Sequence, residues 1–275
     1  MTRLFGVIGY PISHSLSPAM HTAALRALRL DALYAPFEVP SRWVAPVLQG
    51  LVLAGVEGLN VTVPLKQAVL PLMHRLDRTA REIGAVNTIV VRRRRLIGHN
   101  TDAAGFLRAL GELGWRPGPT RAVILGAGGS ARAVAWALAR APGSRLTIAN
   151  RHPAKARALA RWLRRIAPRV QVEACGLPGV RLDKAQLLVN ATTVGMRASD
   201  GSPIDARTLR PGLLVYDLVY HRPTALVEAA RRRGCVAAGG RSMLLYQGAE
   251  SLRLWLRRTP PIAVMRRALA EAIRT

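Results

Sequence analysis

The chain has 275 residues, half of them hydrophobic, so it is long enough for one or two globular domains with a substantial core. No apolar run reaches the ~18 residues that span a bilayer, and no signal-peptide pattern precedes the strand-like segment that begins at Leu4, which favours a cytoplasmic protein without a membrane partner. The net charge of +26 is spread along the whole chain and is not interleaved with aromatic residues, which favours a compositional bias of the source genome over a nucleic-acid partner.

Short apolar runs alternate with helical patterns from end to end, which is typical of βαβ units and a largely parallel sheet. In the first part of the chain, Ser17 and Pro18 mark a helix start, with the serine at the cap position and the proline in the first turn. The elements predicted here are strands over 4–8, 33–39 and 58–63, helices over 18–28 and 43–54, and a β-hairpin over 86–97 with four arginines at its solvated turn.

The second part of the chain begins with a helix from Asp102 to about Leu113, followed by a Pro/Gly-rich link. Further predicted elements are strands over 121–125, 145–150, 187–190 and 213–217, and helices over 243–255 and 262–273. Cys175 and Cys235 lie far apart, with no CxxC or histidine pairing around them. They are predicted to be free thiols in the core, and neither a disulfide framework nor a metal site is indicated.

A glycine-rich turn joins the strand over 121–125 directly to the next helix. Such a turn lets the backbone approach a pyrophosphate and aims the free N–H groups of the helix N-terminus at it. Gly126, Gly128 and Gly129 supply the turn, while the small residues Ser130 and Ala131 leave room for a ligand. A tight connection would use the same residues, but the position after a buried strand favours a dinucleotide site.

The end of the second strand of this unit indicates which dinucleotide is bound. An Asp or Glu ~20 residues beyond the loop binds the ribose hydroxyls of NAD, whereas an arginine there accommodates the 2′-phosphate of NADP. This strand ends in Asn150-Arg151-His152, Lys155 follows one turn on, and no carboxylate lies between residues 145 and 160. The pattern predicts NADP(H) over NAD(H).

Lys66 is one of only three lysines in a chain that is rich in arginine. A lysine can give and take a proton, whereas an arginine stays charged in proteins. Lys66 ends the segment over 60–66, in which no other charge occurs, whereas Lys155 and Lys184 are as readily explained as surface residues. Lys66 is therefore a candidate for proton chemistry.

Together these motifs resemble the shikimate dehydrogenase family, in the family's order and over nearly the whole chain. The segments that carry the resemblance are 9–21, 60–66, 84–88, 98–102, 126–131, 150–151, 190–196, 217–220 and 240–247. The resemblance implies two α/β domains. A substrate-binding domain would comprise residues 1–101 with 240–275, and a Rossmann-type NADP-binding domain would comprise residues 102–239.

The resemblance also implies the reaction, a reversible NADPH-dependent reduction of 3-dehydroshikimate to shikimate by a monomer or homodimer with small-molecule partners only. Lys66 would give and take the proton, assisted by Asp102, while His14 and His21 would be structural. The implied substrate contacts are Ser15, Ser17, Thr62, Asn87, Tyr220 and Gln247. The implied cofactor contacts are Gly126, Ala127, Gly128, Gly129, Ser130, Ala131, Asn150, Arg151, His152, Lys155, Thr192, Leu218 and Gly240.

The chain departs from the family pattern at a few positions, and two alternatives to this function remain. His152 stands where the family commonly has a small hydroxyl residue, and the spacing after Tyr220 is altered to His221-Arg-Pro-Thr224. The nearest alternative is a quinate/shikimate dehydrogenase that prefers NAD. The other is a non-catalytic relative that binds a nucleotide or uses its charge to bind nucleic acid.

Overall fold

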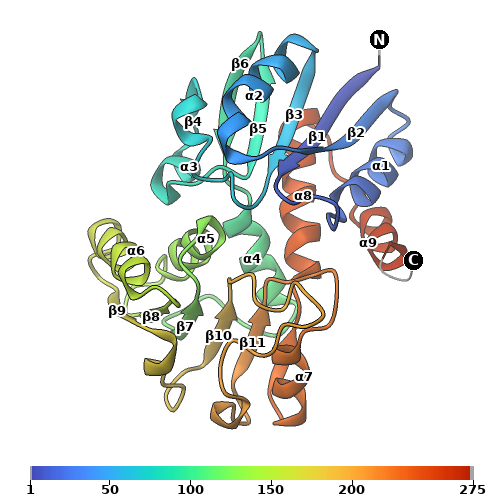
Figure 1. Ribbon diagram of the computed structural model, residues 1–275. Helices are drawn as coiled ribbons and strands as arrows, with labels where there is room; N and C mark the ends of the chain where they lie inside the picture. The colour runs from blue at the N-terminus through green and yellow to red at the C-terminus, as the bar shows by residue number, and fades with distance from the viewer. Residues whose placement is uncertain (1, 273–275) are drawn as a thin grey trace. The chain divides into compact units, whose positions relative to one another are not determined.

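The computed structural model describes residues 2–272 and divides the chain into two compact units, each with its own six-stranded sheet (Figure 1). Unit 1 comprises Met1–Gly105 and Leu244–Thr275, and unit 2 comprises Phe106–Met243. The chain passes from one unit to the other inside helices α4 (Asp102–Gly111) and α8 (Arg241–Leu256).

The sheet of unit 1 is mixed. Its strands follow the order β2 (Ala32–Glu38), β1 (Arg3–Gly9), β3 (Val56–Val61), β5 (Thr88–Arg92), β6 (Arg95–His99) and β4 (Arg75–Leu76). β1 pairs in parallel with β2 and β3, while β5 runs antiparallel to β3 and β6. The predicted hairpin is confirmed, because Arg93 and Arg94 form its two-residue turn with φ values of 50° and 61°. Two positive φ angles in succession are typical of a turn that joins antiparallel strands.

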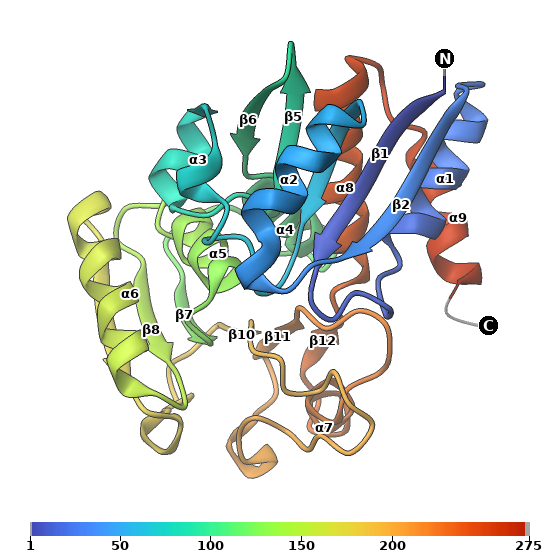
Figure 2. The ribbon, with the colours of Figure 1, turned by 45° about the horizontal axis from the view of Figure 1, so that its top comes forward.

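Side chains of this sheet alternate between two covering layers. On one face α2 (Val44–Leu53) closes an apolar core that includes Val44, Leu48, Ile8, Leu59 and Val61. On the other face Trp255 of α8 stacks on Phe5 with 5.3 Å between ring centroids, and a Cβ on Gly58 would lie only 2.3 Å from its indole nitrogen. Figures 1 and 2 show α2 and the unit 1 part of α8 on opposite faces. The face towards α8 therefore receives the alternate residues of β3 and β5.

Helix α1 (Ser17–Ala27) packs beside β2 and the C-terminal helix α9 (Ile262–Glu271). The predicted cap at Ser17 is wrong: Leu16 occupies the N-cap with helical angles, and Ser17 is already the first helical residue. The Ser15 hydroxyl accepts a hydrogen bond from the backbone N–H of Ser17 at 3.3 Å. The predicted end of the last helix at Ile273 lies outside the described residues.

The remaining differences in unit 1 are shifts of element ends and two short elements that were not predicted. β3 starts and ends two residues earlier than predicted, and a 3₁₀ turn, η1 (Ser41–Trp43), replaces the first turn of the predicted helix over 43–54. The unpredicted elements are β4 and helix α3 (Arg78–Ile83). α3 carries its own signals, because Asp77 accepts a capping hydrogen bond from Ala80 and Gly84 closes the helix with a φ of 68°.

The sheet of unit 2 is entirely parallel. Its order is β12 (Val236–Ala238), β11 (Leu214–Asp217), β10 (Leu187–Asn190), β7 (Arg121–Leu125), β8 (Arg145–Ala149) and β9 (Gln171–Cys175). The chain starts at β7, moves outwards to β9, returns to β10 and moves outwards again to β12. Strand order therefore reverses between β7 and β10, and in such sheets ligands bind beyond the carboxyl ends of the strands at this switch point.

The helices of unit 2 follow from this winding. α5 (Gly129–Leu138) and α6 (Pro153–Ile166) pack against β7, β8 and β9 (Figure 1), whereas α7 (Ala225–Arg232) packs against β11 and β12 (Figure 2). Right-handed crossovers place these two sets on opposite faces. The prediction of free thiols is confirmed: Cys235 is buried in the core beneath α7, and Cys175 is half-buried at its margin. Between residues 2 and 272, no helix combines the length and apolarity that crossing a membrane requires.

Candidate active site and cofactor site

Several candidate residues of unit 1 meet at one edge of its sheet. Ile8 lies opposite Val61 in the parallel pair β1–β3, so the segments that follow these strands start side by side. A Cβ on Gly9 would lie 2.4 Å from the Thr62 side chain, which shows how closely the two segments approach. Because β5 is antiparallel to β3, the start of β5 with the preceding Asn87 lies at the same edge, as does the end of β6. Asp102 follows β6 three residues later.

Lys66 and Asp102 form an ion pair at this edge. The lysine Nζ lies 2.6 Å from Asp102 Oδ2, and the two side chains are 12% and 4% exposed. Asp102 is the first residue of α4, where the helix dipole favours a carboxylate, and its backbone N–H donates to the Asn100 side chain at 3.1 Å. The structure thus holds an ammonium group in a nearly dry position with one carboxylate oxygen as its anchor.

Asn87 holds the other oxygen of that carboxylate. Its Oδ1 accepts a hydrogen bond from the backbone N–H of Thr101 at 2.7 Å, which fixes the orientation of the amide because a backbone N–H can only donate. The amide nitrogen therefore faces Asp102 Oδ1, at 2.8 Å, and Gln247 Oε1, at 3.1 Å. Lys66, Asp102, Asn87 and Gln247 form one connected cluster.

A buried polar network lies behind this cluster, between the sheet and α8. Asn60 accepts a hydrogen bond from the Tyr34 hydroxyl at 2.8 Å and donates to Ser251 at 2.9 Å, while the hydroxyls of Ser251 and Thr88 lie 2.7 Å apart. Thr88 reaches Asn87 Oδ1 at 3.1 Å. These roles were not predicted from the sequence. The available signal was a polar side chain, Asn60 or Thr88, in each of the otherwise apolar strands β3 and β5.

The other predicted residues of unit 1 line the same region or the layer beneath it. Ser17 and Gln247 are buried, and Ser15 and Thr62 are half-buried. His21 is fully buried, its ring stacks on Tyr34 with 4.4 Å between centroids, and neither ring nitrogen has a hydrogen-bond partner within the described residues. Burial lowers the pKa of His21 to about 3, so the ring is neutral and packs as an aromatic side chain.

The cofactor candidates of unit 2 all follow carboxyl ends of strands. Gly126 has a φ of 112°, and a Cβ there would lie 2.7 Å from the Ala191 carbonyl oxygen, so the turn after β7 requires glycine. A Cβ on Gly128 would meet nothing within 4 Å, and Gly128 caps α5 without any side-chain hydrogen bond. The turn into α5 therefore leaves space beside Gly128, with Ala127, Gly129, Ser130 and Ala131 adjacent in the chain.

The turn after β8 presents positive charge beside this loop. Gly126 donates to the Ala149 carbonyl at 2.7 Å, which places the ends of β7 and β8 together. Asn150 shapes the turn by accepting the backbone N–H of His152 at 2.8 Å. Arg151, His152 and Lys155 are exposed beyond it. On the other side of the switch point, Thr192, Leu218 and Gly240 follow β10, β11 and β12.

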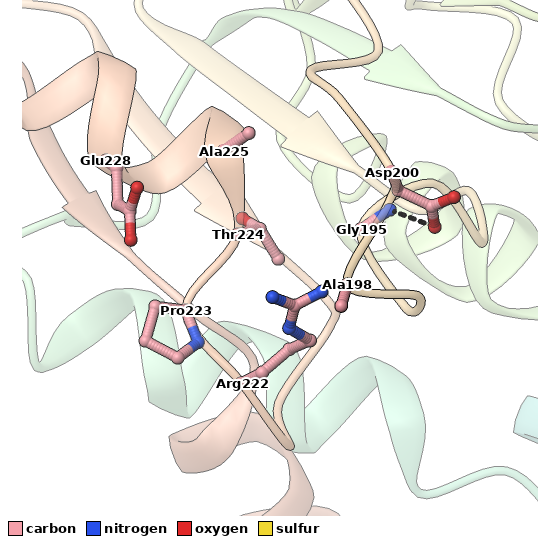
Figure 3. A pocket seen from close by; sticks show the side chains of 8 residues that line it. All are labelled: Gly195, Ala198, Asp200, Arg222, Pro223, Thr224, Ala225 and Glu228. Carbon is pink, nitrogen blue, oxygen red and sulfur yellow. Dashed lines mark hydrogen bonds between the residues drawn. The ribbon is translucent and has the colours of Figure 1, made fainter.

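The residues over 195–228 also form a pocket of about 150 Å³, shown in Figure 3. None of the predicted site residues lines it; the lining consists of Gly195, Ala198, Asp200, Arg222, Pro223, Thr224, Ala225 and Glu228. Tyr220 lies nearby in sequence, half-buried, with its ring edge against His221. Within residues 2–272, no cluster of histidine, cysteine and carboxylate side chains has the makings of a metal site.

Comparison with known proteins decides the family. Residues 7–89 match the shikimate dehydrogenase substrate binding domain, and residues 240–270 match the shikimate 5′-dehydrogenase C-terminal domain. The NADP(+)-dependent shikimate dehydrogenase of Rubrobacter xylanophilus is 47% identical over 98% of this chain and 96% of its own length. The chain belongs to the shikimate dehydrogenase family.

Solved structures of the shikimate dehydrogenase family share the fold throughout. The shikimate 5-dehydrogenase of Thermus thermophilus, in complex with NADP(H) and shikimate, is 38% identical, with a TM-score of 0.87 over 98% of this chain and 100% of that one. The quinate dehydrogenase of Corynebacterium glutamicum, in complex with NAD, is 33% identical, with a TM-score of 0.88 over 98% of this chain and 99% of that one. The same fold thus serves both substrates and both dinucleotides.

Proposed function

We propose that this chain catalyses the reversible NADPH-dependent reduction of 3-dehydroshikimate to shikimate, a step of aromatic amino-acid biosynthesis. The enzyme is an NADP-dependent oxidoreductase, as the similarity to shikimate dehydrogenases over the full length supports. The observation that carries the proposal is the buried cluster of Lys66, Asp102 and Asn87, in a unit whose residues 7–89 match the family's substrate-binding domain.

Lys66 supplies and removes the proton. When bound, NADPH supplies a hydride to the ring ketone, and the oxygen of that ketone then needs a proton. The ammonium group of Lys66 donates it, and in the reverse direction the amine accepts the hydroxyl proton. Asp102 Oδ2, 2.6 Å from Nζ, keeps the amine in one position, and Asn87 keeps the carboxylate in place. The proton is therefore delivered from a fixed point.

The remaining polar side chains of unit 1 suit a small polyhydroxylated carboxylic acid. We assign the carboxylate to Ser15 and Ser17, without an arginine; both lie in the segment after β1, just before and at the start of α1. Thr62, Asn87 and Gln247 offer hydroxyl and amide groups for the hydroxyls of the ring. Asn87 and Gln247 already bond each other at 3.1 Å, so their donors and acceptors have defined directions.

The residues of unit 2 fit NADP(H). The open backbone at Gly128 and the uncapped start of α5 fit a pyrophosphate. Arg151, with His152 and Lys155 beyond it, offers positive charge where the ribose of the adenosine half lies in such folds. A 2′-phosphate is attracted there, whereas NAD would have no acidic partner for its ribose hydroxyls.

Steady-state assays with shikimate or quinate, each with NADP or NAD, test the proposal. We expect shikimate with NADP to give the highest kcat/KM. Replacing shikimate by quinate, or NADP by NAD, should lower it by at least about tenfold, since a tenfold preference corresponds to only ~1.4 kcal/mol. An Arg151→Ala variant serves as the control for the cofactor, because it should reduce the preference for NADP without changing that for shikimate. A native preference for NAD or quinate would reject the assignment in favour of the quinate/shikimate type.

A further inference from the structure

Asp217 is a buried carboxylate that the proposed chemistry does not use. It ends β11, is 0% exposed, and takes part in none of the ion pairs found within residues 2–272. Three donors converge on it: Asn190 Nδ2 and the Val219 backbone N–H each reach Oδ1 at 3.0 Å, and the Thr224 hydroxyl reaches Oδ2 at 2.7 Å. Burial raises the pKa of Asp217, and these hydrogen bonds oppose the shift. Burying a carboxyl group costs free energy unless hydrogen bonds compensate, so the position of Asp217 calls for a structural explanation.

Asn190 extends this contact into the segment after β10. Its Oδ1 accepts both the backbone N–H and the hydroxyl of Thr192, at 3.1 and 2.7 Å, so its amide nitrogen must face Asp217. The same nitrogen donates to the Val194 carbonyl at 3.1 Å, and the Val194 N–H donates back to the Thr192 hydroxyl at 3.1 Å. One side-chain pair, Asp217 with Asn190, therefore fixes the backbone after β10 and after β11 together.

The third donor ties in α7. Thr224 is the N-cap of this helix and accepts the Val227 N–H at 3.3 Å while donating to Asp217. Gly195 packs against it with a φ of 103°, and a Cβ there would lie 2.9 Å from Thr224 Cγ2. Figure 3 shows Gly195 and Thr224 on neighbouring segments of the same pocket. The segment after β10 therefore contacts Asn190 at its start and Thr224 near Gly195, and both of these side chains donate hydrogen bonds to Asp217.

The place of these segments in the sheet gives them a role. The strand order matches the two-half dinucleotide fold, in which β7, β8 and β9 form one half and β10, β11 and β12 the other. The phosphate loop and Arg151 follow β7 and β8, so the adenosine end belongs to the first half. We propose that Asp217, acting through Asn190, is a positioning residue that fixes the segments after β10 and β11 against which the nicotinamide ring rests. This rests on the proposed NADP-dependent function.

Replacing Asp217 by alanine removes one acceptor from each of three buried donors. The segments after β10 and β11 then lose their common anchor, while the phosphate loop after β7 keeps its own hydrogen bonds to Ala149 and around Gly126. Hydride transfer needs the reacting atoms in near-contact and aligned, and a misplacement of about 1 Å costs on the order of 10²-fold in rate. Binding of the adenosine end does not depend on that alignment.

The test compares native protein with Asp217→Ala and Asp217→Asn. Adenosine 2′,5′-bisphosphate, which lacks the nicotinamide, and NADPH are titrated in a binding assay. The kcat for 3-dehydroshikimate reduction and its isotope effect with NADPH deuterated at the transferred position are measured alongside. For Asp217→Ala we expect unchanged bisphosphate affinity, weaker NADPH binding, a kcat lower by about 10²-fold and a larger isotope effect. Asp217→Asn keeps the shape and one acceptor oxygen, and should recover most of the rate.

Three results separate the possible failures. A folded Asp217→Ala variant with near-native kcat and isotope effect, or with equal losses for bisphosphate and NADPH, would overturn the positioning role while leaving the proposed function intact. A native chain without shikimate turnover would overturn the proposed function, and the ratio of the two affinities would still test Asp217. If Asp217→Ala does not fold, Thr224→Val must lower kcat and Thr224→Ser must restore it; unchanged kcat in Thr224→Val would contradict the role.

Discussion

At the scale of single residues, the candidate centre is one connected set of hydrogen bonds. Asp102 meets Lys66 Nζ with one oxygen and Asn87 Nδ2 with the other, at 2.6 and 2.8 Å. Donors and acceptors whose directions are fixed by other hydrogen bonds reorganise little when charge develops, and such electrostatic stabilisation is usually a large part of catalysis. The backbone N–H of Thr101 sets the direction of the Asn87 amide and so completes the arrangement.

His21 makes the stability of the enzyme sensitive to acid. Burial lowers its pKa from 6.5 to about 3. Below pH 6.5, His21 therefore binds a proton in the unfolded chain but stays neutral in the folded chain. Stability is therefore lost as the pH falls from about 7 towards 3, and the loss between pH 7 and pH 5 amounts to about 2 kcal/mol from this group. Urea unfolding of native protein and His21→Phe at both pH values measures it.

The matched control for His21 is His152→Thr, which removes an exposed histidine that lies outside the core. His21→Phe retains an aromatic ring on Tyr34 but cannot titrate, so its free energy of unfolding should fall by about 2 kcal/mol less than that of native protein over the same range. If the free energy of unfolding falls equally in native protein and His21→Phe between the two pH values, the neutral buried state of His21 is contradicted.

Residue prediction from the sequence depended on segments that carry their own signal. Lys66 was visible as a rare lysine in an uncharged segment, and Asn87 and Asp102 were placed beside it by resemblance. The roles of Asn60, Thr88 and Ser251 were not predicted, because their bonds join positions as far apart as residues 60 and 251. Asp217 and Asn190 were likewise invisible, since only the parallel pairing of β10 and β11 brings them together.

At the scale of elements, two glycines in the loop between β7 and α5 have different structural roles. Gly126 needs its positive φ and the space beside Ala191, whereas Gly128 has an ordinary φ of −85° and open space around its Cα. Gly126 is therefore required by the backbone conformation of the turn, whereas Gly128 leaves space for a ligand. A pair of alanine substitutions can separate these two roles.

We expect Gly126→Ala to lower the free energy of unfolding by roughly 2 kcal/mol or more, because the backbone is strained and the methyl group meets a carbonyl oxygen. Gly128→Ala should change stability by less than about 1 kcal/mol but weaken NADP binding by about tenfold, because the methyl group occupies the approach of the pyrophosphate. Denaturant unfolding and NADP titration on both variants are the measurements. Native NADP affinity in Gly128→Ala would rule out this loop as the phosphate site.

Element prediction was best for buried strands and worst for short pieces at the sheet margins. β7, β10 and β11 were found almost to the residue because they are continuous apolar runs that end in marked turns. β4, β9 and β12 were not predicted: β4 and β12 span only two and three residues, and β9 alternates exposed with covered side chains at an edge. Edge strands take their identity from the neighbour they pair with, which the local pattern does not reveal.

At the scale of the whole molecule, the two units hold different candidate groups. Unit 1 holds the ion pair of Lys66 with Asp102, and unit 2 holds the glycine-rich turn after β7. The fold class and the presence of two α/β units followed from alternating apolar and helical patterns together with the resemblance. The net charge of +26 has no concentration in either part that would demand a polyanionic partner. Oxidoreductase chemistry accounts for the groups that the structure brings together.

The most direct test of this account is the kcat for shikimate-dependent reduction of NADP in native protein and in Lys66→Arg. Arginine keeps the positive charge beside Asp102 but cannot exchange a proton at neutral pH. We expect kcat to fall by about 10²- to 10⁴-fold, the usual contribution of a general acid or base, while the KM for NADP and the unfolding midpoint stay close to native. Turnover by Lys66→Arg at a near-native rate would contradict proton transfer by Lys66.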